Sequence, residues 1–560
     1  MEGFLNTLHL LKLPTVKIRF LLLIITIVFF SCKKDESISF NENVAVDSIY
    51  INNIFVANKG KINNIDFNRI TIRVSFNSKV DTSKFKKRSF FFSGGIDTFY
   101  TYKFKTDSKH LLINPYKNFK ALTSYNFYIN PDKNLGGLIT QTYSINFYTK
   151  IDSTYKFPTI TDDELLTLVQ HQTFKYFWDF AHPTSGLARE RNTSGDIVTT
   201  GGSGFGLMTI PIGIERGFIT RSEGTERINK IVNFLTLATR YHGAWPHWMN
   251  GTTGATIPFG TNDDGGDLVE TSYMAAGLLC VRQYLNASDN SENSIINNIN
   301  TLLSQIEWSW YTKSGENVLY WHWSPNVGWA MNMQIKGYNE ALITYFMAAT
   351  STTYPINKTV YENGWASNGG IKNGRSFYGI TLPVGYDYGG PLFFAHYSFL
   401  GLNPTNLSDQ YANYWQQNVN HTLINRQYCI NNPKKYLGYS QDCWGLTASD
   451  DPSGYGVHEP TNDNGVITPT AAISSIPYSP ENSLKAIRFF YYILGDKLWG
   501  DYGFYDAFSL NSNWWASSYL AIDQGPIVIM IENYRSGLCW NLFMSAPETQ
   551  QAMTKLGFSN

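Results

Sequence analysis

Hydrophobic and polar residues alternate in the N-terminal part of the chain and recur at helical spacing over the rest. The alternating segments are 70–76, 100–104, 111–113, 125–129 and 143–147. Turn-forming residues, such as those at 93–95 and 130–132, separate these segments. Short strands at this spacing are typical of an all-β sandwich. We therefore predict a small β domain over residues 41–150.

The period changes near residue 160. Thr161 and Glu164 have the S/T-x-x-E spacing of a capping box, which marks the start of a helix. Apolar residues then recur at helical spacing from Leu165 to Phe180. Further helical patterns cover 228–235, 268–285, 295–306, 340–349, 407–424, 484–494 and 527–534. Because strands and helices do not alternate here, a toroid of helices over 161–560 fits better than an α/β barrel, with 151–160 as a linker.

The first residues have the pattern of a targeting signal. Lys12, Lys17 and Arg19 precede an apolar run at 20–30. This run is too short to span a bilayer, which needs about 20 residues, but has the size of a signal-peptide core. The segment 28–32 resembles a lipobox, so we expect a signal peptide at 1–31, lipidated Cys32 and a tether at 32–40. The alternative is an ordinary secretory signal cut near Ser31.

Charge and composition exclude some classes of function. Lys plus Arg and Asp plus Glu both number 44, so the net charge is zero. This excludes a nucleic-acid binder that works by bulk electrostatics and a chain kept disordered by its charge. Aromatic residues make up 16% of the chain. That content suits either a neutral, ring-shaped ligand such as a sugar polymer or a large aromatic core.

The cysteines show no metal-binding pattern. Beyond Cys32 they are Cys280, Cys429, Cys443 and Cys539, which lie far apart. An oxidising compartment would allow a disulfide between Cys429 and Cys443, but we expect all four to be small buried hydrophobes. Histidines show no H-E-x-x-H spacing, and no G-x-S-x-G motif is present. We therefore expect no metal and no cofactor.

Acidic residues in glycine-rich and aromatic loops are the candidates for catalysis, because splitting a glycosidic bond requires two carboxyl groups. Asp267 and Glu270 are three residues apart and share one helix face, and Asp263 precedes them in a glycine-rich loop. The same arrangement can cap a helix. One carboxylate can do both.

Glu340 is predicted to open a helix that follows the aromatic stretch 319–325. Burial beside aromatic rings raises the pKa of a carboxyl group, as a general acid requires. The alternative is a helix N-terminal Glu favoured by the dipole. Glu459 precedes Pro460 on a loop, where it could bind sugar hydroxyls, take part in catalysis or only tie down the loop. For Asp506 and Asp523 we favour structural roles, with Asp523 as a helix N-cap that has a buried partner.

Aromatic residues close in sequence to these acids could stack on sugar rings. The candidates are Trp245, His247, Trp248, Trp321, Trp323 and Trp329. Each alone could equally belong to the core, and their clustering in loops beside the acids favours binding.

Three motifs resemble a known family. The segments 445–450, 454–465 and 521–534 resemble the glycoamylase-like domain, which includes the endo-β-1,2-glucanases of glycoside hydrolase family 144. The resemblance covers about 161–558 and implies an all-α (α/α)6 barrel with a wide cleft. It also implies an inverting hydrolase that cuts inside β-1,2-glucan to release sophorooligosaccharides. Residues 70–85 resemble bacterial Ig-like domains, so an Ig-like sandwich is expected to precede the barrel as a spacer or, alternatively, a sugar-binding module.

The resemblance also implies roles for individual residues. The important acids of the family correspond to Asp263, Asp267, Glu270 and Glu340 in this chain. We predict that Glu340 is the general acid and that Asp267 activates water, directly or through a relay. Asp263 and Glu270 would then shape the site.

Other functions remain open at this point. They are a non-catalytic glycan-binding lipoprotein, a polysaccharide lyase, an α-glucan hydrolase that acts from chain ends, and a hydrolase or transglycosylase acting on another glucan. We expect a monomeric outer-membrane lipoprotein that faces the periplasm or the cell surface and binds a polysaccharide but no nucleic acid.

Overall fold

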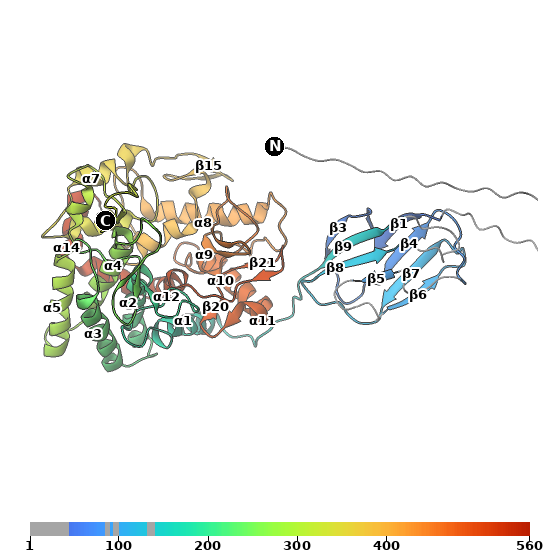
Figure 1. Ribbon diagram of the computed structural model, residues 1–560, viewed down its shortest axis with the longest axis horizontal. Helices are drawn as coiled ribbons and strands as arrows, with labels where there is room; N and C mark the ends of the chain where they lie inside the picture. Colours follow the sequence, from blue (N-terminus) through green and yellow to red (C-terminus); the bar gives the residue numbers. More distant parts are fainter. Residues whose placement is uncertain (1–43, 84–89, 93–99, 131–140, 560) are drawn as a thin grey trace, which may run out of the picture.

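The computed structural model of the chain describes residues 44–83, 90–92, 100–130 and 141–559. The predicted signal peptide, Cys32 and the tether lie outside these residues. Figure 1 shows a β domain and a larger helical domain joined by one connecting segment. None of the described helices combines the length and the apolar content needed to cross a membrane.

The β domain consists of two sheets that enclose a common core. One sheet has the strand order β2-β1-β4-β7-β6 and the other the order β3-β9-β8-β5. The strands are β1 (Val46–Ile51), β2 (Ile54–Val56), β3 (Lys61–Ile65), β4 (Ile72–Phe76), β5 (Phe90–Phe92), β6 (Tyr100–Phe104), β7 (His110–Pro115), β8 (Ser124–Ile129) and β9 (Tyr143–Thr149). Alternate residues Tyr125, Phe127 and Ile129 of β8 are buried between the sheets, which confirms the alternating pattern of this strand.

The helical domain contains long helices connected by loops with short strand pairs. Its helices are α1 (Asp162–Trp178), α2 (Thr200–Glu215), α3 (Arg221–Leu237), α4 (Leu268–Tyr284), α5 (Asn290–Ser304), α6 (Leu342–Thr350), α7 (Lys358–Asn363), α8 (Tyr414–Asn431), α9 (Pro469–Ile473), α10 (Pro480–Arg488), α11 (Gly495–Leu498), α12 (Ala521–Arg535), α13 (Leu538–Ser545) and α14 (Pro547–Leu556). The 3-10 turns used below are η5 (Leu392–Ala395) and η6 (Tyr397–Phe399).

Short strands pair within the loops of this domain. They are β10 (Ile197–Thr199), β11 (Trp248–Asn250), β12 (Thr256–Ile257), β13 (Gly266–Asp267), β14 (His322–Trp323), β15 (Ser376–Phe377), β16 (Ile380–Thr381), β17 (Ala448–Asp451), β18 (Gly454–Val457), β19 (Trp499–Gly500), β20 (Gly503–Phe504), β21 (Phe508–Ser509) and β22 (Trp514–Trp515). The pairs β13–β14 and β17–β18 carry acidic residues that are important below.

The helices form a barrel with an inner and an outer layer. On the inside, α2 packs on α4 and α12, α4 packs on α6, α6 meets η6, and α12 packs on α9. A hydrogen bond of 3.0 Å between His396 Nε2 and Ser475 Oγ connects the turns η5 and η6 to the end of α9. All nine residues of α6 are buried, as expected of a helix surrounded by protein. The outer helix α5 buries only one face.

Glycines allow the inner helices α2 and α4 to touch. A Cβ atom on Gly204 would lie 2.3 Å from the carbonyl oxygen of Tyr273, and one on Gly277 would lie 2.2 Å from that of Gly204. Larger residues would force the two backbones apart. The contact therefore fixes the N-terminal ends of α2 and α4 beside each other.

Helix starts agree with the sequence where the signal is local. The capping box of Thr161 and Glu164 is present and begins α1. Three predicted boundaries are wrong. Helix α8 begins at Tyr414 rather than Leu407, because Asp409 Oδ1 accepts hydrogen bonds from the backbone N–H groups of Tyr411 and Ala412 in a turn.

The other two boundaries concern acidic residues. Helix α6 begins at Leu342, so Glu340 lies just before it and not in its first turn. Ser398 Oγ donates to the carbonyl oxygen of Glu340 and holds this segment in a turn. Helix α12 begins at Ala521, so Asp523 lies inside its first turn and is not the N-cap.

The two domains share an apolar interface. Leu122 and Tyr148 of the β domain belong to the same buried cluster as Tyr491 and Leu494 of the helical domain. The four described cysteines are all free and buried, as expected.

Candidate active site

The site is built at the N-terminal end of the inner helices, around the start of α4. Asp267 is the N-cap of α4, and its Oδ1 accepts hydrogen bonds from the backbone N–H groups of Val269 at 3.0 Å and Glu270 at 2.9 Å. The side chain is completely buried. Both roles considered from the sequence are therefore compatible, because capping uses one oxygen and leaves Oδ2 for other partners.

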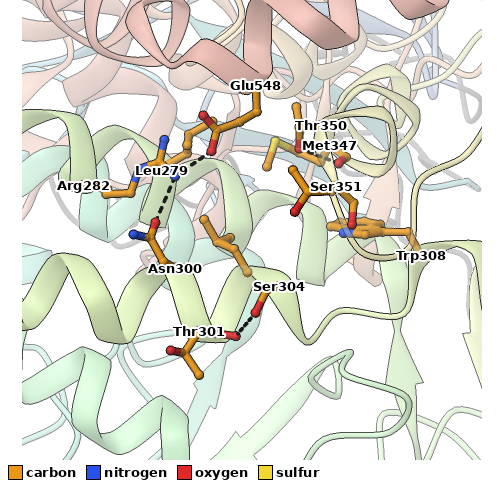
Figure 2. Close-up of a pocket in the computed structure, with 12 residues that line it drawn as sticks. Leu279, Arg282, Asn300, Thr301, Ser304, Trp308, Met347, Thr350, Ser351 and Glu548 are labelled. Atoms are coloured by element: carbon orange, nitrogen blue, oxygen red, sulfur yellow. Dashed lines mark hydrogen bonds and ion pairs between the residues drawn. The ribbon is translucent and has the colours of Figure 1, made fainter.

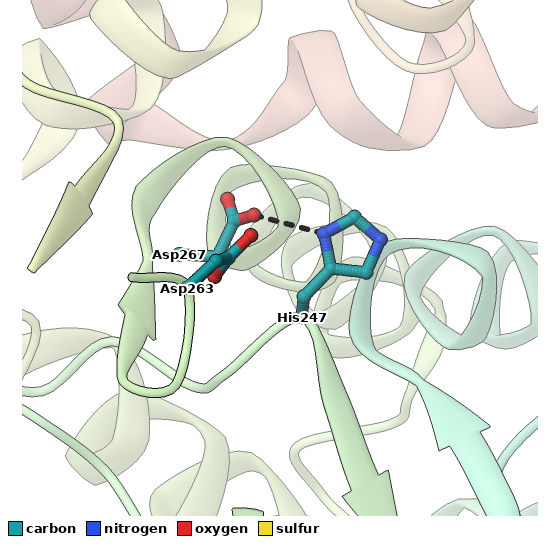
Figure 3. Close-up of side chains that lie close together, drawn as sticks. All are labelled: His247, Asp263 and Asp267. Atoms are coloured by element: carbon teal, nitrogen blue, oxygen red, sulfur yellow. Dashed lines mark hydrogen bonds and ion pairs between the residues drawn. The ribbon is translucent and has the colours of Figure 1, made fainter. Parts of the chain in front are cut away.

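Two histidines surround the second oxygen of Asp267. His247 Nδ1 lies 3.0 Å from Asp267 Oδ2, as Figure 3 shows. His322 Nε2 lies 3.1 Å from Asp263 Oδ2 and 3.4 Å from Asp267 Oδ2. Strand pairing places His322 directly opposite Asp267. His322 was missed as a site residue, although it lies within the aromatic stretch that drew attention to Glu340.

The charges of this network stabilise one another. Burial alone would raise the pKa of Asp267. The charge of His322 and the hydrogen bonds from His247 and His322 outweigh this effect, so the pKa is lowered overall. Burial lowers the pKa of both histidines, yet the neighbouring carboxylates raise it to about 10 for His322 and to about 9 for His247. At neutral pH, Asp267 is therefore ionised and both imidazoles are protonated.

Glu270 points from the first turn of α4 towards the start of α2. Its Oε2 accepts a hydrogen bond of 2.6 Å from the backbone N–H of Gly201 and lies 3.4 Å from Thr199 Oγ1. Burial raises its pKa, and the charge of Asp267 adds to this effect, while His247 and the Gly201 N–H oppose it. A Cβ atom on Gly201 would lie 2.5 Å from Glu270 Oε2, so only glycine fits there.

Glu340 faces the same region from the turn before α6. Burial raises its pKa to about 7, and the charges of Glu270 and Asp267 contribute in the same direction. The phenol of Tyr273 interacts electrostatically with Glu340, Glu270 and Asp267. The structure thus brings together the acids predicted from the sequence, and it supplies a carboxyl group that is still protonated near neutral pH beside one that is ionised.

The aromatic candidates divide into buried and accessible residues. The prediction for Trp245 is wrong, because its side chain is 0% exposed and lies in the core. Its backbone N–H donates to Thr271 Oγ1, and its carbonyl oxygen accepts from the Asp267 N–H, which fixes the ring inside. Trp248 is partly exposed and meets Phe259 edge-on at 4.7 Å. Phe259 is 51% exposed and stacks on His247 at 4.2 Å, and sequence reasoning missed it.

Trp321, Trp323 and Trp329 are partly exposed. Trp321 stacks on His322, with ring centroids 5.8 Å apart. Trp323 and Trp329 both pack against Trp310, at 5.4 and 4.8 Å. Glu459 is partly exposed, and its carboxylate accepts a hydrogen bond from Thr461 of its own loop.

A second group of acids lies around the start of α12. Asp506 and Asp523 are buried and interact electrostatically with each other, and burial raises the pKa of Asp506 to about 7. Asp506 Oδ2 accepts from the backbone N–H of Asp450 at 2.7 Å. Tyr397 OH donates to Asp523 Oδ1 at 3.4 Å. Asp506 and Tyr397 are therefore the buried partners of Asp523, and they come from distant parts of the sequence.

Some of these residues have the donor atoms of a metal site. One ligand atom each from His247, Asp263 and Asp267 lies within 4.8 Å of the others (Figure 3). The same carboxylates are paired with His247 and His322, which are protonated at neutral pH and supply the positive charge that a cation would bring. The carboxylates are therefore neutralised in an ion-pair network, in which Nδ1 of His322 is buried without a hydrogen-bond partner among the described residues.

A cavity of about 380 Å³ lies at the other end of the same helices (Figure 2). It is lined by Leu279 and Arg282 from the last turns of α4 and by Thr350 at the end of α6. Arg282 is paired there with Glu548 at 2.6 Å. Because the acids that could act on a glycosidic bond lie at the opposite helix ends, this cavity is not the candidate active site.

Known proteins resemble this chain in sequence and in structure. The family model described as "Glycoamylase: Putative glucoamylase" matches residues 332–547. An exo β-1,2-glucooligosaccharide sophorohydrolase (non-reducing end) from Parabacteroides distasonis is 47% identical over 420 residues, which are 71% of this chain and 58% of the relative. The chain thus spans about three fifths of the length of that curated relative.

Two solved structures match the helical domain over nearly their full length. A putative glucoamylase from Bacteroides uniformis is 59% identical, with a TM-score of 0.71 and coverage of 72% of this chain and 99% of that protein. An endo-β-1,2-glucanase from Chitinophaga pinensis, in complex with sophorotriose and glucose, is 53% identical, with a TM-score of 0.70 and the same coverage.

Proposed function

This chain belongs to the family of the Chitinophaga endo-β-1,2-glucanase, to which it is 53% identical over 99% of that protein, and we propose that it is a glycoside hydrolase of β-1,2-glucan. The observation that carries the proposal is the pairing of two unlike acids at one end of the barrel. Glu340 has a pKa raised to about 7, whereas the pKa of Asp267 is lowered. Carboxyl groups whose pKa values are separated in this way are typical of an acid and base pair.

In the proposed mechanism, Glu340 protonates the oxygen of the leaving sugar. Asp267 is the base that activates the attacking water. Its Oδ1 accepts from two backbone N–H groups, and its Oδ2 interacts with His247 and His322. Because it is buried, this carboxylate is poorly suited to attack a sugar carbon itself. Its burial supports inversion, with the proton reaching the base through a bridging hydroxyl or water.

Glu270 and Asp263 hold this arrangement in place. Asp263 orients His322 beside Asp267, and Glu270 ties the start of α4 to Gly201 at the start of α2. Phe259, Trp248 and Trp321 offer apolar ring faces around the acids, which suits the C–H faces of pyranose rings.

The test is to incubate the purified protein with linear β-1,2-glucan, starch and a polyuronate and to size the products over time. We expect only β-1,2-glucan to be shortened, to a mixture of sophorooligosaccharides whose new reducing ends first appear as the α anomer by NMR. Degradation of starch or the polyuronate without β-1,2-glucan would refute the proposal, and a β anomer would refute inversion.

A second mode of action is supported by the Parabacteroides relative, whose name describes release of sophorose from non-reducing ends. The same time course separates the two modes. Early products of many lengths indicate internal cleavage, whereas sophorose alone from the first minutes indicates action at chain ends.

We also propose that the protein is a monomeric outer-membrane lipoprotein, anchored through Cys32 and held away from the membrane by an Ig-like β domain. The apolar contact of Leu122 and Tyr148 with the helical domain supports a fixed spacer. Labelling cells with a fatty-acid analogue should mark the wild-type protein but not Cys32→Ala. Equal labelling of both proteins would refute the anchor.

A further inference from the structure

A pocket beside the second group of acids has the chemistry of a sugar-binding site. Its volume is about 410 Å³, and it is lined by Arg191, by Asp450 and Tyr455 of the hairpin β17–β18, by Trp514 of β22 and by Ser518. We call it the Arg191 pocket. Its size lies in the range of small-ligand sites.

The polar groups of the Arg191 pocket are fixed by their neighbours. Asp450 accepts hydrogen bonds from Arg191 Nη1 at 3.1 and 3.2 Å and from Ser518 Oγ at 2.5 Å. Glu190 accepts from Arg191 Nε at 3.0 and 3.1 Å. Arg191 Nη2 has no partner among the residues that the structure describes. A rigid guanidinium with free N–H groups next to a carboxylate presents donors and acceptors to adjacent hydroxyl groups.

Two aromatic rings of the pocket are available for stacking. Tyr455 is 52% exposed and Trp514 is partly exposed, and in the described part of the chain neither ring packs on another. Trp515 provides the contrast. One face of its ring stacks on Phe508 at 5.5 Å, and the ammonium group of Lys497 lies 5.2 Å from its centre.

Polar interactions connect the Arg191 pocket to the active site. Asp450 N–H donates to Asp506, Asp506 interacts electrostatically with Asp523, and Asp523 accepts from Tyr397 OH. The Tyr397 phenol interacts electrostatically with both Asp523 and Glu340. Asp523 lies in the first turn of α12, which packs on α2. The pocket therefore opens at the same end of the barrel as the acids.

We propose that the Arg191 pocket is a binding subsite for a glucosyl unit of the polysaccharide, at a distance from the bond that is cut. Arg191 is paired with two carboxylates, Asp450 and Glu190, so the group has no excess positive charge, and the rings are apolar. A neutral sugar therefore fits better than an acidic one. This inference rests on the proposed function. It adds residues that would strengthen the binding of long glucan chains.

The test uses Trp514→Ala and Tyr455→Ala, each also made in a Glu340→Gln background so that binding can be measured without turnover. Tyr534→Ala is the matched control, because Tyr534 is 41% exposed and lies at the other end of α12. Calorimetry with long β-1,2-glucan should show binding weakened about five- to tenfold by each pocket variant and unchanged by the control. In the active enzyme, KM should rise more for long glucan than for the shortest oligosaccharide cleaved.

Failure of the two proposals is distinguishable. If the unmodified enzyme cleaves β-1,2-glucan but both pocket variants bind it like Tyr534→Ala, the subsite is refuted and the activity stands. If the unmodified protein neither binds nor cleaves β-1,2-glucan, the proposed function fails first. Should Trp514→Ala unfold, Tyr455→Ala decides the matter, because removing an exposed ring leaves the core unchanged.

Discussion

Replacing Glu340 by Gln removes the carboxyl group that we assign as general acid while keeping its size. Gln cannot donate the proton that the leaving oxygen requires, so kcat should fall by about 10² to 10⁴, the usual contribution of a general acid. In the wild-type enzyme, activity should decline as pH rises through about 7, where Glu340 loses its proton. Because the pKa of Asp267 is lowered, activity should persist well into the acidic range.

The same substitution has a defined effect on stability. The pKa of Glu340 is raised from its ordinary value of 4.5 to about 7 in the folded protein. The folded state therefore binds this proton more tightly than the unfolded state, and stability falls as pH rises from 4.5 to 7. A rise of this size corresponds to at most about 3 kcal/mol, and since the side chain is partly exposed we expect about 1–2 kcal/mol. Glu340→Gln does not lose this stability.

The assay is denaturant unfolding of both proteins at pH 5 and pH 8. The free energy of unfolding of Glu340→Gln relative to wild type should increase by about 1–2 kcal/mol between the two pH values. A difference that stays constant with pH would show that Glu340 is not held protonated by burial. Near-normal turnover by the variant would remove Glu340 from the acid role, whatever the stability data show.

Asp267→Asn should keep the cap of α4, because an amide oxygen accepts hydrogen bonds from the same backbone N–H groups, but it should reduce kcat by at least about 100-fold. Circular dichroism tests the first expectation and initial rates on β-1,2-glucan test the second, and a fully active variant would exclude Asp267 as the base. Gly201→Ala places a Cβ atom 2.5 Å from Glu270 Oε2, so kcat should fall by about tenfold and the melting temperature by a few degrees. The variant Ala471→Gly serves as a control for a substitution in another inner helix. Incubation with EDTA should leave activity unchanged, because histidines supply the positive charge in the Asp267 network; loss of activity that a divalent ion restores would make His247, Asp263 and Asp267 metal ligands.

Local patterns were sufficient where neighbours in sequence determine the structure. The alternation of Tyr125, Phe127 and Ile129 with more polar residues identifies a strand that has one buried face. Thr161 and Glu164 accept hydrogen bonds from backbone N–H groups at the start of α1. The clustering of Asp267 and Glu270 follows from helix periodicity. These features depend on contacts within a few residues, and the sequence displays them directly.

Features that depend on distant residues could not be predicted in this way. The turn at Glu340 is held by Ser398, which is 58 residues away. Trp245 is drawn into the core because its backbone is bonded to residues at the start of α4. Asp450 and Asp506 meet only because β17 lies beside the segment before β21. In each case the deciding partner comes from another element of the barrel.

The Asp267 side chain both caps α4 and is the proposed base, so turnover requires the first turn of α4 to be folded. If the first turn of this helix frays on heating, the base loses its orientation while the remaining core is still folded. Heat inactivation should therefore begin below the temperature of global unfolding, and it should be reversible on cooling. A ligand that binds at this end of the barrel would protect against this early loss.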